Sequence, residues 1–472
     1  MSTTFRWTRL AGALAASLLG ACAGLVPPPP ALPLPQPAPL PARFAADQGT
    51  PGTPLEEADW SVLGDAALAS LVRQGLHANL SVQQAIARIE HARALANGRE
   101  AARGPYGGIR MGASATRSAS VDAPSGARRA DRVFADLAAG WELDLFGRLS
   151  NDAQAGWIRV QAQSEDAQAV RLSVASEIAL AWYTLLGLRE QERLTREVIT
   201  NRREVVRLVA LRTRAGETAR FDEARAQADL AQVQAQLPRL LADAQATSHR
   251  LAVLLGVMPS EFEPPASQAA SATRSIALQI PPPAMWMEQR ADLRAARARL
   301  QAQGIDIRSI EAEFMPRMEI RGVLGFVAGT LGGWSGAGSA AWWLAPTLSV
   351  PLFDRRSIEA RLSAARIQER EHLLAYRGAT LTAVAEVEEA LGRLGAGQQQ
   401  LDHLRAHLVH ANDAHKLAQA RLRAGEGDLL ELLDAQRVAH VAALALAQAH
   451  AEQQQRTVVL LKVLGTAPRP VA

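Results

Sequence analysis

The chain contains a single cysteine, Cys22, among its 472 residues. It therefore cannot form an internal disulfide or a cluster of thiolate metal ligands. Aromatic residues make up only 4% of the sequence, the formal net charge is only +4, and no block of five or six like charges occurs. The sequence thus lacks the basic, aromatic-interleaved surface that binds single-stranded nucleic acid, and we expect no nucleic-acid partner.

The sequence also lacks catalytic and cofactor motifs. The glycine-rich stretch 329–338 has no Gly-Lys-Ser/Thr ending, which a phosphate-binding loop requires. His403, His407 and His410 share a helix face, and they could bind a divalent metal. Only Asp402 offers a carboxylate beside them, so a solvated stripe is the preferred interpretation. We expect no enzyme activity, no metal and no cofactor, so energy for any transport has to come from another protein.

The N-terminus has the features of an export signal. Arg6 and Arg9 precede a short apolar run, residues 10–19, which is followed at once by Ala21 and Cys22. This pattern resembles a bacterial lipobox, in which a peptidase cleaves before the cysteine and the thiol is acylated. The alternatives are a buried free cysteine or a short membrane anchor, although the run is far shorter than the roughly 20 residues of a spanning helix.

The residues after Cys22 indicate where such an anchor would lie. Ala23 follows the cysteine, and in lipoproteins the absence of aspartate at that position is associated with export to the outer membrane. Residues 26–42 are rich in proline, which is typical of an extended polyproline spacer. We expect this spacer to hold the body of the protein away from its lipid anchor.

A long part of the chain is duplicated. Phe146 and Phe353 lie in similar segments 207 residues apart, and Gly216 and Gly425 lie in similar segments 209 residues apart. Such self-similarity indicates a repeated structural unit. The proline-free run that ends near Arg214 begins at Leu149, and as one helix it would be about 100 Å long. Each copy is thus predicted to join short strands to one long helical hairpin.

Four amphipathic strands are expected, two in each copy. Apolar residues alternate with polar or small ones over 133–146, 318–326 and 342–352, and a weaker strand surrounds Ile109 and Met111. Each has about ten residues, the length that crosses an outer membrane in a tilted strand. A soluble sandwich would alternate in the same way. Four strands cannot close a barrel but three copies would supply twelve, so closure predicts a trimer.

The ends of the two long hairpins share the sequence Arg-Ala-Gly-Glu. A glycine at this place can adopt the left-handed conformation that ends a helix. Return helices are expected from about Ala219 and Asp428, with a kink before Pro238 in the first. The residues of the two tips are Arg214, Ala215, Gly216 and Glu217 in the first copy and Arg423, Ala424, Gly425 and Glu426 in the second.

The lipobox, the proline-rich spacer, the paired strands and the duplicated hairpins together resemble the TolC-like outer-membrane efflux proteins, specifically the NodT-family lipoproteins. The resemblance covers nearly all of the mature chain and rests on the order and duplication of these features. It implies a mainly α fold with a small membrane β-barrel, in which a homotrimer forms a 12-stranded barrel continued by an α-helical periplasmic tunnel.

The same resemblance implies a function and a set of partners. The protein would be the exit duct of a tripartite, RND-type efflux system in the cell outer membrane, passively conducting drugs or other toxic compounds. Its partners would be a periplasmic adaptor, an inner-membrane transporter and outer-membrane lipids. A channel for type I protein secretion is an alternative. A periplasmic adaptor would have one hairpin in a β-rich body, and a structural coiled-coil lipoprotein would lack the strand pairs.

The resemblance also places functional residues. Glu431 and Asp434 match the acidic positions that ring the constriction of such tunnels, and Asp222 is a weaker candidate from the first copy. The two hairpin tips are the expected contacts of the adaptor. Gly427 stands where some members carry an arginine that ties the tip shut, so the mode of closure is open.

The expected organisation along the chain has six parts. They are a signal peptide (1–21), a lipidated N-terminus with its spacer (22–54), the first repeat (55–258), a linker (259–283), the second repeat (284–466) and a tail (467–472).

Overall fold

A computed structural model describes residues 43–45, 53–54, 63–118, 128–265, 278–328 and 340–465. Cys22, the signal peptide, the proline-rich spacer and the C-terminal tail lie outside these residues. The chain divides into two compact units. The first contains Glu90–Ala162 and Ala296–Tyr376, and the second contains Leu40–Ile89, Gln163–Ala295 and Arg377–Ala472.

The helices and strands occur in two similar series. The first is α2 (Ala66–Ala78), α3 (Leu80–Ala101), β2 (Tyr106–Ser118), β3 (Arg128–Leu143), α4 (Arg148–Arg214), α5 (Arg220–Gln234) and α6 (Gln236–Leu254). The second is α7 (Pro283–Gln289), α8 (Ala291–Ala312), β5 (Arg317–Ala328), β6 (Ala340–Ser349), α9 (Arg355–Ala424) and α10 (Leu429–Val463). Helices α4 and α9 begin 207 residues apart, and α5 and α10 begin 209 apart. The duplication read from the sequence is confirmed.

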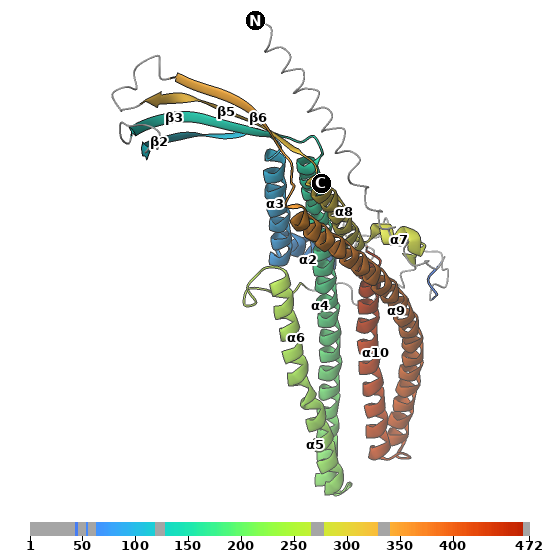
Figure 1. Ribbon diagram of the computed structural model, residues 1–472. Coiled ribbons are helices and arrows are strands. Elements are labelled where there is room, and N and C mark those ends of the chain that lie inside the picture. Colours follow the sequence, from blue (N-terminus) through green and yellow to red (C-terminus); the bar gives the residue numbers. More distant parts are fainter. Residues whose placement is uncertain are drawn as a thin grey trace. The chain divides into compact units, whose positions relative to one another are not determined.

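The first unit contains one four-stranded antiparallel sheet in the order β2-β3-β5-β6 (Figure 1). The register brings apolar side chains into rows across one face. The row through the middle of β5 consists of Ile109, Leu137, Leu324 and Trp342, all of them exposed. Apolar side chains that face outward in neighbouring strands form a surface suited to lipid rather than to water.

The opposite face of the same sheet carries charged side chains. Arg110 Nε lies 2.9 Å from Asp136 Oδ1 on the neighbouring strand, and Arg321 Nη2 lies 2.7 Å from Glu319 Oε2. Tyr106 donates a hydrogen bond to Glu319. The predicted alternation is therefore confirmed, because neighbouring residues in a strand point to opposite faces.

The strands end and begin at slightly different places than predicted. β3 ends at Leu143 rather than residue 146, because Asp144 turns to accept hydrogen bonds from the backbone N–H groups of Leu149 (3.0 Å) and Ser150 (2.7 Å), which caps α4. Gly147 takes a φ of +77° in this turn. β6 ends at Ser349 rather than residue 352, and β3 begins at Arg128, five residues before the predicted start at residue 133.

The long hairpins belong mainly to the second unit. In the first hairpin α4 returns through α5 and α6, which are separated at Ala235. The break lies just before Pro238, as predicted, because proline lacks the N–H that would continue the helical ladder and its ring crowds the carbonyl four residues earlier. The second hairpin returns through α10 without a break.

The core of the second unit follows the apolar stripe of α4. Val174, Ile178, Ala181 and Leu185 are all buried, at the spacing of four and three that places residues on one face of a helix. Among the described residues, α4 is the one helix with a segment long and apolar enough to cross a membrane, and half of that segment is buried in the protein. We interpret the segment as helical core.

A second, smaller sheet was not predicted. β1 (Thr53–Pro54) pairs in parallel with β4 (Leu278–Gln279), which lies between the two repeats in the sequence. Nearby in the chain, Phe44 packs edge-on against Trp286 with ring centroids 5.4 Å apart. Trp286 Nε1 in turn donates to the carbonyl of Val463 at 3.2 Å. These contacts hold the residues just before the first repeat against the end of α10.

Candidate functional site at the hairpin tips

The two hairpin tips have the same backbone structure. At the end of α4 the N–H of Glu217 donates to the carbonyl of Arg212 at 2.9 Å, and the N–H of Gly216 donates to that of Thr213 at 3.1 Å. At the end of α9 the N–H of Glu426 donates to Arg421 at 3.0 Å and that of Gly425 to Leu422 at 3.2 Å. This pair of bonds is the Schellman motif. It requires φ values of +77° and +76° at the two glycines, which residues with a Cβ adopt only under strain.

Gly427 has a separate structural role in the second tip. A Cβ at this position would lie 2.9 Å from the backbone nitrogen of Leu422 and 3.1 Å from the Cβ of Arg421. The N–H of Gly427 also donates to the carbonyl of Arg421 at 3.1 Å. Any side chain here, arginine included, would therefore push the tip away from the end of α9.

The two acidic residues of α10 lie on its exposed surface, and each contacts an arginine of its own hairpin. Arg421 Nη1 lies 2.5 Å from Glu431 Oε1, and Arg437 Nη2 lies 2.7 Å from Asp434 Oδ1. The side chains of Glu431 and Asp434 are 45% and 60% exposed, so both remain open to solvent and ions. Within one chain each of these carboxylates is therefore paired with an arginine, and the two do not form an isolated negative patch.

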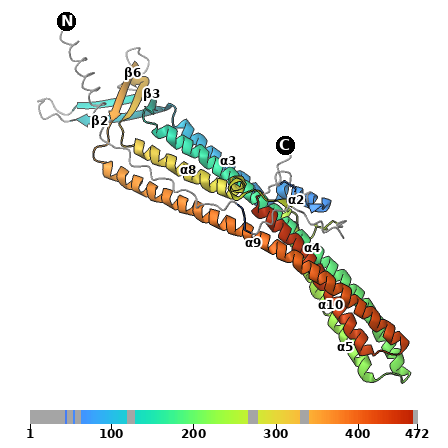
Figure 2. The ribbon, with the colours of Figure 1, turned by 90° about the vertical axis from the view of Figure 1, so that its right-hand side faces the viewer.

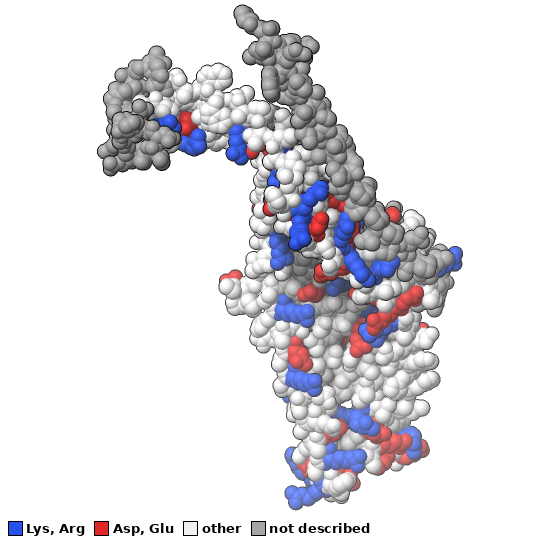
Figure 3. Space-filling model, in the orientation of Figure 1, with Lys and Arg blue, Asp and Glu red and all other residues white. Residues whose placement is uncertain are grey.

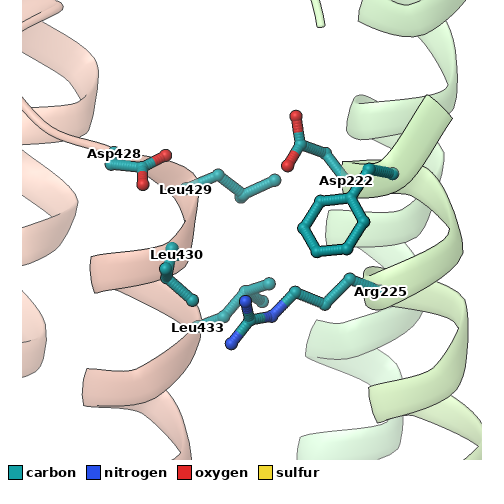
Figure 4. A pocket seen from close by; sticks show the side chains of 7 residues that line it. Asp222, Arg225, Asp428, Leu429, Leu430 and Leu433 are labelled. Carbon is teal, nitrogen blue, oxygen red and sulfur yellow. The ribbon is translucent and has the colours of Figure 1, made fainter. Parts of the chain in front are cut away.

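Asp222 lies at a different place, in a cavity between α5 and α10. The cavity has a volume of about 120 Å³, and Asp222 and Asp428 face each other across it, as Figure 4 shows. Both carboxylates lie at helix N-termini, where the helix dipole favours negative charge. The other lining residues are Phe221, Arg225, Leu429, Leu430 and Leu433. Within this chain Asp222 thus faces Asp428, whereas Glu431 and Asp434 contact arginines of their own hairpin.

The outermost residues of both tips are accessible. Arg214, Gly216 and Glu217 are exposed, as are Arg423 and Glu426. Acidic and basic side chains are mixed over this end of the hairpins in the face shown in Figure 3. Mixed charge on a glycine-capped turn suits contact with a partner that is itself polar at its end.

The whole arrangement matches one known family. The model of the outer membrane efflux protein family matches residues 71–257 and 284–466, which are the two structural repeats. The chain belongs to this family.

Individual members of the outer membrane efflux protein family are similar over most of their length. Outer membrane protein OprJ of Pseudomonas aeruginosa is 32% identical over 422 residues, which cover 88% of this chain and 87% of OprJ. Nodulation protein T of Rhizobium leguminosarum bv. trifolii is 27% identical over 480 residues and 99% of both chains. The structure of the outer-membrane channel OprN superposes with a TM-score of 0.85, at 30% identity, over 94% of this chain and 100% of that one.

These matches establish the general function of the protein. It is an efflux channel of the outer membrane with the helical hairpins of a periplasmic tunnel, and the proteins it resembles are channels rather than enzymes. In the part of the chain that the structure describes, no three His, Cys, Asp or Glu side chains are grouped so as to hold a metal ion, and His403, His407 and His410 are exposed along α9.

Several residues of this candidate site were not identified from the sequence. Arg421 lies ten residues before Glu431, and only the reversal of the chain at Gly425 brings their side chains together. Phe221 was visible as an aromatic residue beside Asp222, and its 69% exposure in the structure marks it as part of the tip surface. Asp428 carried no signal of its own, because an aspartate before a helix is an ordinary N-cap residue.

Proposed function

We propose that the protein acts as a homotrimeric exit duct of a tripartite efflux system. The observation that carries this proposal is the four-stranded sheet with one apolar exposed face and two edges, β2 and β6. A strand edge in lipid leaves backbone N–H and carbonyl groups without partners, at a cost of several kcal/mol for each group. Pairing β6 of one copy with β2 of the next removes both edges, and three copies give a closed barrel of twelve strands.

The lumen of such a barrel would be lined by the polar face of the sheet. Arg110, Asp136, Glu319 and Arg321 would then face water, and the row of apolar residues through Leu324 would face lipid. This is the pattern of outer-membrane barrels. Cys22 would carry the lipid that holds the N-terminus in the same membrane, with the proline-rich spacer between them.

The periplasmic tips would contact the other components of the pump. The exposed turns 214–217 and 423–426 are the candidate contacts of a periplasmic adaptor, and an inner-membrane transporter would supply the energy and select the compounds. Glu431, Asp434 and, from the first hairpin, Asp222 are the candidate residues of the constriction. The conducted compounds would be drugs or other toxic molecules of low mass.

Deletion and complementation test this proposal in the organism of origin. Cells without the gene are expected to accumulate several times more of a fluorescent hydrophobic dye, and the wild-type gene restores export. The double variant Glu217→Arg and Glu426→Arg reverses charge at both tips and should fail to restore export, although the purified variant still conducts ions in a planar bilayer.

The matched control reverses two exposed charges on the shafts of the same hairpins, Glu197→Arg and Asp402→Arg. This control is expected to export normally. Equal accumulation with and without the gene over a panel of dyes and antibiotics would count against the proposed efflux role. Normal export by the tip variant would show that the tips are not the surface that contacts the adaptor.

A further inference from the structure

Behind the tips, the two hairpins of one chain are packed together through α4 and α10. Gln455 donates from α10 to Thr184 of α4 at 3.0 Å, and a Cβ added to Gly187 would lie 2.5 Å from that of Ala451. Nearer the tips, Arg202 of α4 contacts α10. From Thr184 to Arg202 the chain of α4 runs toward its C-terminus, and the residues of α10 that they contact run back from Gln455 to Gln436. The two helices are therefore antiparallel, as Figure 2 also shows.

Arg202 is the charged residue at the centre of this contact. Its side chain is only 3% exposed. Nη1 donates to Gln436 Oε1 at 3.1 Å, and Nη2 donates to the carbonyl of Leu433 at 3.4 Å. These two residues flank Asp434 on α10. A side chain of the first hairpin thus holds the helical turn that carries a candidate constriction residue of the second.

Among the described residues, a single carboxylate balances the charge of Arg202. Asp229 of α5 places Oδ2 2.9 Å from Nη1, but the contact does not have hydrogen-bond geometry. Both Arg202 Nε and Asp229 Oδ2 are buried without a hydrogen-bond partner among the described residues. A buried ion pair whose remaining polar atoms are unsatisfied contributes little net stability and is sensitive to any further charge.

Two histidines lie beside this ion pair. His440 of α10 is 9% exposed, and neither of its ring nitrogens has a partner in the described part of the chain. His415 of α9 has a buried Nε2 that is also without one. Burial and the positive charge of Arg202 lower the pKa of both, and for His440 the carboxylate of Asp229 opposes this shift. Both rings are therefore neutral at neutral pH.

We propose that Arg202 is a positioning residue for the constriction, and that Arg202, His415 and His440 form an acid-sensitive latch between the two hairpins. Protonation of either histidine places a second buried positive charge near Arg202, where Arg437 already lies close enough to act on it. Asp229 can balance only one of these charges. The contact between α4 and α10 then weakens, and the segment that carries Asp434 is released.

The direction of the pH effect follows from the lowered pKa values. When the hairpins separate, the histidines regain water and titrate near the ordinary value of 6.5. The separated state thus binds more protons than the packed state once the pH falls below that value. The packed state has its full stability above pH 6.5. It loses stability as the pH falls from 6.5 toward the lowered pKa values of the two histidines. Below those pKa values its stability no longer changes with pH through these groups.

Distances between the two tips test the latch without relying on conduction. Cys22 is the only native cysteine and is predicted to be blocked by lipid, so spin labels can be attached at Arg214→Cys and Arg423→Cys. The distance between the labels is measured in the full-length protein by double electron–electron resonance. The measurement is made at about pH 7.5 and at about pH 5.5, one unit either side of the ordinary histidine pKa. A second, longer tip-to-tip distance is expected at the lower pH.

Three variants in this background decide the outcome. His415→Gln with His440→Gln removes the titrating groups and should give the neutral-pH distance at both pH values, whereas Arg202→Gln should give the longer distance at both. The control His403→Gln, His407→Gln and His410→Gln, on the exposed face of α9, should respond to pH as the parent does.

An unchanged parent distance, or a pH response that survives in the His415 and His440 variant, would overturn the latch. A normal distance in folded Arg202→Gln would overturn its positioning role. The latch rests on the proposed function only for its effect on transport. A protein that fails to conduct but shows the distance change would contradict the proposed function and not the latch.

Discussion

Replacing both Glu431 and Asp434 by alanine is expected to shift the ion preference of the channel strongly toward anions. In the proposed homotrimer the two positions would supply six carboxylates around one axis. Their partners Arg421 and Arg437 remain in the variant, without a counter-charge. The proposed constriction would then change from a nearly balanced ring of ion pairs to a ring of arginines. The reversal potential in a salt gradient across a planar bilayer should shift to that of an anion-selective pore, and the conductance should rise as side-chain volume is lost.

The same variant should be much less sensitive to block by divalent cations. A divalent ion about 5 Å from one carboxylate in water is attracted by about 1.7 kcal/mol, which is roughly 20-fold in affinity. Loss of several carboxylates therefore weakens block by at least about two orders of magnitude. The matched variant Arg421→Ala with Arg437→Ala should change both properties in the opposite direction. Unchanged selectivity and block in both variants would place the constriction elsewhere.

A single arginine on the apolar face of the sheet is expected to prevent assembly. Leu324 is 61% exposed in the row of apolar residues that crosses all four strands. An arginine at the midplane of an outer-membrane barrel costs about 2–4 kcal/mol in each copy. Leu324→Arg should therefore yield little of the heat-modifiable oligomer in outer-membrane fractions, as judged by the mobility of unheated samples on gels.

The neighbouring residue provides the control for this prediction. Val323 lies on the opposite face of β5, which already carries Arg321 two residues earlier. Val323→Arg should assemble normally and change only the ion preference of the lumen. If both arginine variants assembled equally well, or if Val323→Arg were the more damaging, the assignment of the lipid-facing side would be reversed or wrong.

The fold could be predicted well where local sequence controls it. The stripe on α4 and the alternation in β3 and β5 are direct consequences of helix and strand periodicity, and Pro238 marks the break between α5 and α6. β2 gave a weak signal because glycine, alanine and serine have low strand propensity, yet all of its residues pair with β3. The C-terminal end of β3 was harder to predict. It depends on Asp144, whose side chain caps α4 only in the folded turn.

The candidate site was less predictable, because its contacts join distant parts of the chain. Glu431 and Asp434 could be placed by resemblance, and the glycine caps by their motif. Arg421, the partner of Glu431, could not, because only the reversal of the chain at Gly425 brings the two side chains together. Arg437 lies one turn after Asp434 on α10, so that pair is local. Arg202 meets Gln436 across 234 residues of sequence, and nothing local to either residue indicates that contact.

We expect copies of this chain to close a barrel that one copy leaves open at β2 and β6. The number of copies can be measured by native mass spectrometry of the protein extracted from outer membranes in mild detergent. A single species is expected, with three times the mass of the mature chain and with lipid at Cys22 of each copy. A monomer released from the membrane without detergent, or an assembly of any other number of copies, would contradict it.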